Sequence, residues 1–219
     1  MLPTRLAKLD EFLSGGIPEG VITDVFGPHG TGKTQFLFQL SANAILEGRN
    51  VLYVDTSGSF RPERIVEIQR QAGRTSDTLD EIEVLRVTNT HDQIKSLQVV
   101  RESKFHLILI DSITDLFSYE YQNSNRTFEK NIAFMQYMYG LSLHAICKKI
   151  PIVVTNTIRH IDGRQIESMQ TAIDMSTHIK IRLSRDDAGF IGNASWLQNS
   201  IKFPYIITSA GLTDVSEAI

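Results

Sequence analysis

The segment GPHGTGKT, residues 27–34, decides the fold, because it fits the phosphate-binding pattern GxxxxGK followed by Ser or Thr. Glycines let the main chain turn its N–H groups inward around phosphate oxygens, where larger residues would clash. A helix that begins at this loop directs its positive end at the same anion. The pattern predicts that Lys33 reaches the β- and γ-phosphates of a nucleotide triphosphate and that the Thr34 hydroxyl binds Mg²⁺. The residues expected to hold the nucleotide here are Gly27, Pro28, His29, Gly30, Thr31, Gly32, Lys33, Thr34 and Gln35.

The sequence on either side of this loop supports the interpretation. VITDVF before it predicts a strand, and QFLFQLSANAIL after it has the apolar spacing of a helix. A glycine-rich turn with a coincidental lysine is the competing interpretation, because the bare pattern also occurs by chance. The strand before the loop and the helix after it favour a nucleotide site.

Elsewhere, short β-branched runs alternate with segments whose apolar residues recur at helical spacing. This alternation is typical of a parallel α/β sheet, and near-continuous apolar runs suit strands covered on both faces. Residues 157–168 are polar and predict a loop, followed by a short helix, a half-exposed strand at 178–185 and two further strands, expected to be antiparallel, near 194–198 and 203–208. The other expected strands are residues 21–26, 51–55, 82–87, 106–111 and 152–156, and the expected helices are residues 34–46, 62–72, 92–102 and 128–149.

A second part of the site is expected at Asp111, which ends the apolar run HLILID. A carboxylate at the end of a buried strand holds Mg²⁺ in Walker-B sites. Such strand ends are common, so the prediction depends on the pairing with the phosphate loop. Thr34 and Asp111 are the predicted metal site, and ATP and Mg²⁺ are the expected ligands.

Composition limits the function classes. The chain has 219 residues, a formal net charge of −3 and one cysteine, Cys147. This length suits a single domain, residues 1–219. The net charge argues against a surface coated with basic residues, but local basic loops are still candidates for phosphate contacts. A lone cysteine forms no internal disulfide and no apolar run is of membrane-spanning length, so a cytoplasmic protein without a membrane partner is expected. Cys147 is expected to be a small buried hydrophobe, and the scattered histidines predict no zinc site.

Several segments together resemble the core of the RecA/RadA recombinase family. They are LDEFLSGGIPEGVITDVFGPHGTGKTQ, VLYVDTSGSFRPERI, LILIDSITDLF, VVTNT and STHIKIRLSR, and the resemblance runs from about Leu9 to the C-terminus. It implies a RecA-like P-loop NTPase core, an α/β fold whose mostly parallel sheet is flanked by helices and continues into antiparallel C-terminal strands. Lys33 and Asp111 are its implied catalytic residues.

In outline the chain resembles the RadB group of archaeal RadA paralogues. It starts almost at the ATPase core, so the N-terminal helical DNA-binding domain of RadA and its FxxA polymerisation linker are expected to be absent. The resemblance implies a role in DNA recombination and repair beside a RadA-type recombinase, with single-stranded DNA as a further ligand and an oligomer through the ATP interface. It also places Arg64 near the adenine, while a solvated helix start is the equal alternative for Arg61 and Arg64.

Two departures from the family pattern bear on activity. Ser57 stands where the family has the glutamate that deprotonates the attacking water, and a serine hydroxyl cannot accept that proton near neutral pH. We therefore expect ATP to bind and to be hydrolysed slowly or not at all, with Glu63 or Asp115 as the alternative base. Thr157 replaces the glutamine that reports the γ-phosphate state, which leaves Asn156 as the expected sensor.

The regions that stand for the two DNA loops of the family are also altered. NSNRTFEKN, residues 123–131, offers Arg126, and residues 157–168 offer Arg159, His160 and Arg164 as phosphate contacts. An ordinary polar loop is an equal alternative for these residues.

The helix predicted at residues 128–149 is rich in large apolar side chains. They include Phe134, Met135, Tyr137, Met138, Tyr139 and Leu141. Packing against the sheet is the favoured interpretation, and a partner-binding surface is the alternative.

Three functions remain open on the sequence. The first is a RadB-like recombination accessory that binds ATP and single-stranded DNA. The second is an interaction module without DNA binding, in which ATP sets a conformation that a partner reads. The third is a KaiC-like signalling ATPase, which shares the core.

Overall fold

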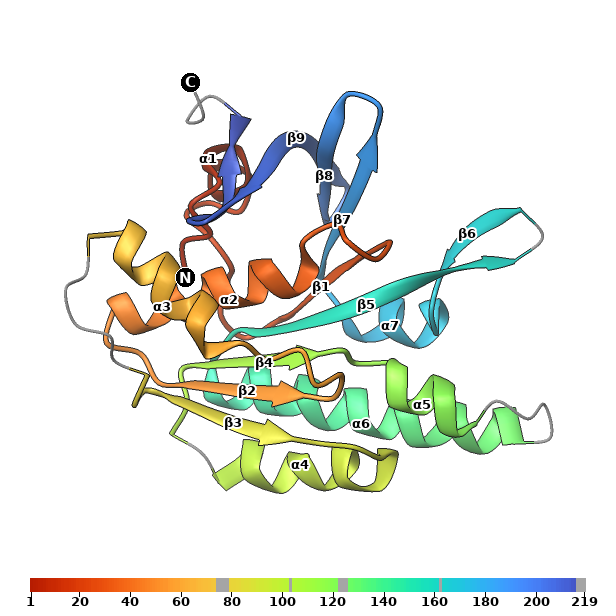
Figure 1. The fold of residues 1–219 in the computed structure, drawn as a ribbon. Coiled ribbons are helices and arrows are strands. Elements are labelled where there is room, and N and C mark those ends of the chain that lie inside the picture. The colour runs from red at the N-terminus through yellow and green to blue at the C-terminus, as the bar shows by residue number, and fades with distance from the viewer. Residues whose placement is uncertain (74–78, 103, 122–125, 162, 216–219) are drawn as a thin grey trace.

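The computed structural model describes residues 1–73, 79–102, 104–121, 126–161 and 163–215 (Figure 1). Within these ranges the side chains of residues 102, 160 and 161 lie outside the description. The helices are α1 (Ala7–Phe12), α2 (Lys33–Leu46), α3 (Pro62–Gln71), α4 (Thr90–Glu102), α5 (Asp115–Glu120), α6 (Thr127–Lys148) and α7 (Gln170–Ser176). The strands are β1 (Ile22–Gly27), β2 (Val51–Asp55), β3 (Ile82–Arg86), β4 (Leu107–Asp111), β5 (Ile152–Ile161), β6 (Arg164–Glu167), β7 (Ile179–Asp186), β8 (Gly189–Trp196), β9 (Asn199–Thr208) and β10 (Gly211–Asp214).

The strands form one twisted sheet in the order β10-β9-β8-β7-β1-β5-β4-β2-β3, and β6 pairs with β5 beside this path (Figure 1). Pairing is parallel from β7 through β1, β5, β4 and β2 to β3. It is antiparallel among β7, β8, β9 and β10. This confirms the predicted α/β class with a mostly parallel sheet and antiparallel C-terminal strands.

Helices cover both faces of the sheet, because strand side chains alternate between two apolar layers. On β2, Val51 and Tyr53 pack into the layer beneath α2 and α3, and Leu52 and Val54 into the layer beneath α4 and α6. The N-terminal segment closes the first layer with five fully or almost fully buried side chains, Leu2, Leu6, Leu9, Leu13 and Ile17.

Some local expectations were wrong. Residues 157–168 are not a loop: β5 continues to Ile161 and pairs with β6 as an antiparallel hairpin. The sequence Asp-Gly at positions 162–163 is typical of such hairpins, so the sequence does carry a local signal for this one. β3 is an edge strand with Val84 41% exposed, so its apolar run is not covered on both faces. Cys147 is exposed, because it lies on the outer face of α6.

The sequence did not predict α1, α5 and β10, which are four to six residues long. Periodicity needs a longer window to be recognised. In the described part of the chain, none of the helices has the length and apolar character needed to cross a membrane.

Candidate functional site

The parallel strands bring the predicted site residues to one edge of the sheet. Gly27 at the end of β1 lies opposite Thr157 of β5, and Asp55 at the end of β2 lies opposite Asp111 at the end of β4. The carboxyl ends of parallel strands share an edge, and ligands of open α/β sheets bind beside it. Segments that are far apart in the sequence therefore meet at a single cleft.

The glycines of the phosphate loop have the backbone shape that the motif requires. Gly30 and Gly32 have φ angles of 76° and 92°, in the left-handed region that side-chain-bearing residues rarely adopt. Gly27 makes a close approach instead, since a Cβ atom there would lie 2.0 Å from the carbonyl oxygen of Leu183. The Tyr205 hydroxyl of β9 donates to the Thr31 carbonyl at 2.7 Å and ties the loop to the antiparallel strands.

Lys33 begins α2 and folds back over the loop. Its ammonium donates to the carbonyl oxygens of Gly27 at 2.9 Å and Pro28 at 2.8 Å. Burial lowers the pKa of Lys33, and the nearby carboxylates of Asp111 and Asp115 oppose this shift. An anion bound beside the ammonium would favour its charged form further.

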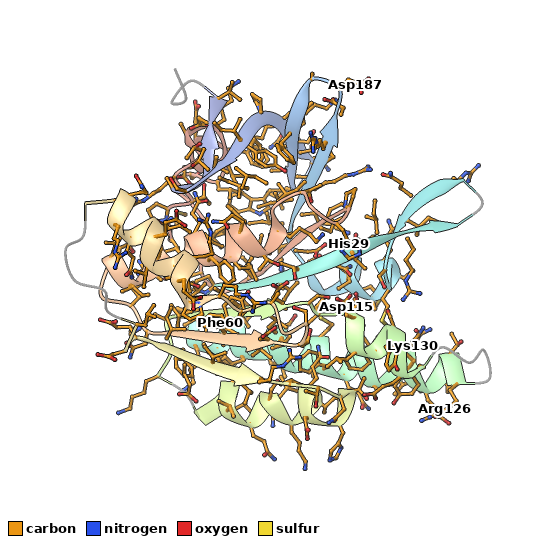
Figure 2. All side chains as sticks on the ribbon, viewed as in Figure 1. His29, Phe60, Asp115, Arg126, Lys130 and Asp187 are labelled. Atoms are coloured by element: carbon orange, nitrogen blue, oxygen red, sulfur yellow. The ribbon has the colours of Figure 1, made fainter. Side chains whose placement is uncertain are left out.

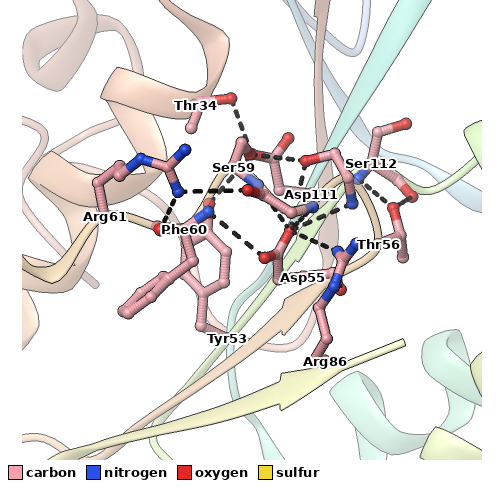
Figure 3. A network of polar contacts seen from close by, with 12 residues as sticks. Thr34, Tyr53, Asp55, Thr56, Ser59, Phe60, Arg61, Arg86, Asp111 and Ser112 are labelled. Carbon is pink, nitrogen blue, oxygen red and sulfur yellow. Dashed lines mark hydrogen bonds and ion pairs between the residues drawn. The ribbon is translucent and has the colours of Figure 1, made fainter. Parts of the chain in front are cut away.

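Asp111 is the centre of a hydroxyl network (Figure 3). Its Oδ2 accepts hydrogen bonds from Thr34 at 2.7 Å, from Tyr53 at 3.1 Å and from Ser59 at 3.1 Å. Its Oδ1 accepts one from Thr155 of β5. Burial raises the pKa of Tyr53 and Asp111 adds to the shift, so the phenol stays protonated and donates. The predicted pair of Thr34 and Asp111 is in direct contact.

Asp55 shapes the turn that presents two serines to the cleft (Figure 3). Its Oδ1 accepts main-chain N–H bonds from Ser57 at 3.1 Å, Gly58 at 2.7 Å and Ser59 at 3.2 Å, which is the pattern of an Asx-turn. Arg86 lies 3.3 Å from the same oxygen. The Ser57 and Ser59 hydroxyls are 2.6 Å apart. Position 57, where the resemblance leads one to expect a glutamate, therefore holds a hydroxyl that is hydrogen-bonded to the neighbouring serine.

These elements enclose a cleft of about 490 Å³. Its polar lining combines loop glycines, one ammonium, hydroxyl groups and two carboxylates, Asp111 and Asp115. Main-chain amides with an ammonium suit a polyphosphate, and hydroxyl with carboxylate oxygens suits a hard divalent cation. The first N–H groups of α2 have no carbonyl partner within the helix, which leaves them available to an anion. The residues present therefore fit ATP with Mg²⁺. His29 and Asp115, both labelled in Figure 2, line this cleft.

Asn156, the expected sensor, lines the cleft but has its side chain fully engaged. Its Oδ1 accepts a bond from Thr114 at 2.6 Å, and its Nδ2 donates to Glu167 at 2.8 Å and to the Ser168 carbonyl at 2.9 Å. It therefore joins the cleft to the end of the β5–β6 hairpin. Thr157 also lines the cleft.

Arg64 is placed beside the cleft. Its guanidinium donates to Gln35 at 3.2 Å, to the Thr208 carbonyl at 3.0 Å and to Glu67. Gln35 lines the cleft and stands between it and Arg64. Glu63, named as an alternative base, is exposed on α3 and does not belong to the lining.

The candidate DNA contacts lie outside the cleft. Arg126 precedes α6, donates to Glu129 at 3.0 Å and covers the Tyr121 ring at 4.7 Å. Arg159 and Arg164 lie exposed on the β5–β6 hairpin, which projects on the same side of the molecule as the start of α6 (Figure 1). The side chain of His160 and residues 123–125 lie outside the described residues.

Sequence reasoning missed four contributors to this site. Tyr53, Ser59 and Thr155 donate to Asp111, and Asp55 builds the serine turn. An aspartate at a strand end followed by Ser-Gly-Ser was a readable signal for the turn. Tyr53 and Thr155 carry no such signal, because only the strand order β5-β4-β2 brings them beside Asp111.

Comparison with known proteins gives consistent matches. A family model described as Rad51 matches residues 1–179. The chain is 34% identical over 174 residues to the DNA repair and recombination protein RadA of Aeropyrum pernix, across 72% of this chain and 53% of that protein. It is 33% identical over 168 residues to the DNA repair and recombination protein RadB of Thermococcus kodakarensis, across 75% of this chain and 73% of that protein. The matched region thus spans about half of the RadA relative and nearly three-quarters of the RadB relative.

Proposed function

The chain belongs to the Rad51 family of recombination and repair proteins, and we propose that it is an ATP-binding paralogue that assists a RadA-type recombinase and hydrolyses ATP slowly or not at all. One observation carries the proposal: the cleft combines a complete phosphate loop and the Thr34–Asp111 pair with a serine at position 57. Such a cleft can hold a nucleotide without the usual means of cleaving it.

The loop from Gly27 to Lys33 would hold the phosphates through main-chain N–H groups and the Lys33 ammonium. Thr34 and Asp111 would hold Mg²⁺, which supplies charge neutralisation at the phosphates. Their contact at 2.7 Å brings together a hydroxyl and a carboxylate oxygen, which are ligands that a hard divalent cation prefers. Arg64 would reach the adenine side through Gln35.

The Ser57 hydroxyl would hold a water but would not take its proton. Loss of a positioned general base lowers the rate by about 10²- to 10⁴-fold. Of the two carboxylates that line the cleft, Asp111 is occupied by four hydroxyl donors, so Asp115 is the alternative base.

A role beside RadA is supported by the two relatives named as DNA repair and recombination proteins. Single-stranded DNA would follow Arg126, Arg159 and Arg164, which lie on one side of the molecule. The second candidate function is a module in which ATP sets a conformation for a protein partner without DNA. The contacts of Asn156 favour this candidate, because they join the cleft to the end of the β5–β6 hairpin through protein groups alone.

A pull-down against an archaeal RadA tests the proposal. We expect RadA to be retained more strongly with Mg·ATP than without nucleotide, and retention of single-stranded DNA to weaken as salt rises. DNA retention that ignores ionic strength would exclude phosphate contacts and favour the protein-only module. Lack of RadA binding in every nucleotide state would overturn the accessory role.

A further inference from the structure

Helix α6 exposes a stripe of large apolar side chains on the face turned away from the sheet. Its inner face is fully buried through Phe134, Tyr137, Met138 and Leu141. On the outer face the exposed apolar side chains are Phe128 at 77%, Ile132 at 41%, Met135 at 43%, Tyr139 at 65%, Leu143 at 42% and Ile146 at 56%. A helix that is apolar on both faces is normally covered on both. The inner face of α6 therefore belongs to the core, as the sequence favoured, and the outer face is the candidate partner surface.

The stripe has the spacing of a coiled-coil seam. Steps of four, three and four residues lead from Phe128 through Ile132 and Met135 to Tyr139, and Ile146 follows one heptad later. Alternation of three and four is the repeat that keeps one helix face against a partner helix. At 1.5 Å per residue, the 18 steps from Phe128 to Ile146 span about 27 Å. α6 packs along the face of the sheet that it shares with α4, so the whole seam lies on one side of the molecule (Figure 1).

The stripe is also symmetric about its own centre. Phe128 and Ile146 are equally distant from position 137, and so are Met135 and Tyr139. Ile132 is matched by position 142, a half-buried serine next to the exposed Leu143. In an antiparallel helix pair, each seam position meets the position reflected through the centre. A second α6 in the opposite direction would therefore bring apolar residues together along the seam.

We propose that α6 is a self-association surface, on which a second copy of this chain lays its own α6 antiparallel across a two-fold axis near residue 137. A two-fold interface requires a surface that is complementary to itself, and the reflected spacing meets that requirement. Phe128 of one copy packs against Ile146 of the other, and Met135 packs against Tyr139.

The charges along α6 suit this arrangement. Residues 131–147 contain no Asp, Glu, Lys or Arg, so two copies of the face do not repel each other. The pairing places Lys148 of one copy opposite Arg126 of the other, where Glu129, which already pairs with Arg126, lies within about one helical turn and offsets the like charges. Antiparallel helix dipoles attract. Met175 of α7, 70% exposed, extends the apolar area beside α6, and Ser142 donates to the Ser176 carbonyl at 3.4 Å where the two helices meet.

The oligomeric state tests the proposal. Sedimentation equilibrium of the intact chain without nucleotide should show a dimer of 24.7-kDa chains. Tyr139→Glu places a charge at the centre of the dry seam and should raise the dimer dissociation constant by more than about 100-fold. Tyr119→Glu changes a similarly exposed tyrosine on α5 outside the stripe and should leave the dimer intact. A monomeric wild-type chain, or a dimer unaffected by Tyr139→Glu, would overturn the proposal.

Thiol cross-linking tests the direction of the two helices. Phe128→Cys and Ile146→Cys, each combined with Cys147→Ser, should cross-link when mixed and not separately. Cross-linking of each variant with itself would indicate a parallel pair and contradict the proposed antiparallel arrangement. ATP binding should be unchanged in Tyr139→Glu, because α6 presents this residue away from the cleft. A failure of ATP binding in the wild type would therefore refute the proposed function while leaving the dimer to be judged separately.

Discussion

At the residue scale, the proposal of slow or absent ATP hydrolysis depends on Ser57. Its hydroxyl lies 2.6 Å from Ser59 and 3.3 Å from Asp55, in a turn held by main-chain N–H bonds, so position 57 is fixed in place. A carboxylate introduced there would point into the same cleft that Ser57 lines. The local structure is therefore ready to accept a general base.

We expect Ser57→Glu to raise the rate of ATP turnover by about 10- to 100-fold, because it restores a proton acceptor beside the γ-phosphate position. Phosphate release at saturating Mg·ATP measures the effect. Ser57→Gln is the matched control, since it adds the same bulk without a base. If the glutamate variant were no faster than the glutamine variant, position 57 would not be the missing base.

A second residue-scale prediction concerns Asp24, which is fully buried on β1 beside Glu167 and Lys180. Burial raises its pKa well above the ordinary value and Glu167 raises it further, while Lys180, with Nζ 3.9 Å from Oδ2, lowers it, and Asp174 raises it slightly. A carboxyl whose pKa rises on folding binds its proton more tightly in the folded state. Folding stability therefore falls as pH increases above the unfolded pKa of about 3.9.

Asp24→Asn should remove this loss. The stability of the variant relative to wild type should be greater at about pH 8 than at about pH 5, because the wild type loses stability as this carboxyl gives up its proton. Urea unfolding at both pH values measures the difference. The exposed Asp187→Asn serves as control, and a stability difference that does not change with pH would argue against a raised pKa at Asp24.

At the scale of elements, Asn156 fastens the β5–β6 hairpin to the cleft. We expect Asn156→Ala to cost about 1–3 kcal/mol of folding stability, since Glu167 and the Ser168 carbonyl lose a buried donor. Amide exchange in β6 should also become faster. Asn193→Ala on β8 is the control, because Asn193 is exposed. Equal effects of the two substitutions on β6 would show that the hairpin does not depend on this contact.

The elements also show what the sequence could foretell. Long periodic segments such as α2 and α6 were predicted to within one residue at each end, because apolar spacing and a nearby loop marked their limits. β2 was predicted with its full range. Short elements and the hairpin were missed, since their partners lie elsewhere in the chain: β6 is a strand only because β5 extends beside it. Likewise, Thr155 joins the site through the neighbour relation of β5 and β4, which no local pattern encodes.

At the scale of the whole molecule, the fold separates two surfaces. The cleft lies at the carboxyl edge of the parallel strands, and the apolar stripe lies on the outer face of α6. A two-fold contact through the stripe would leave the cleft edge open for nucleotide and for a RadA partner. With a net charge of −3, any DNA contact would depend on the local arginines of the hairpin and the α6 start rather than on the charge of the molecule as a whole.

Titration calorimetry of Mg·ATP into the purified chain tests the central claim most directly, when wild type is compared with Lys33→Ala. We predict a saturable heat for wild type and an affinity at least about 100-fold weaker for Lys33→Ala, because an ammonium that contacts phosphate contributes a charge-assisted bond in a partly buried cleft. Lys202→Ala on β9, which alters an exposed lysine, should bind like wild type. No heat with wild type, or equal affinity in wild type and Lys33→Ala, would contradict the account.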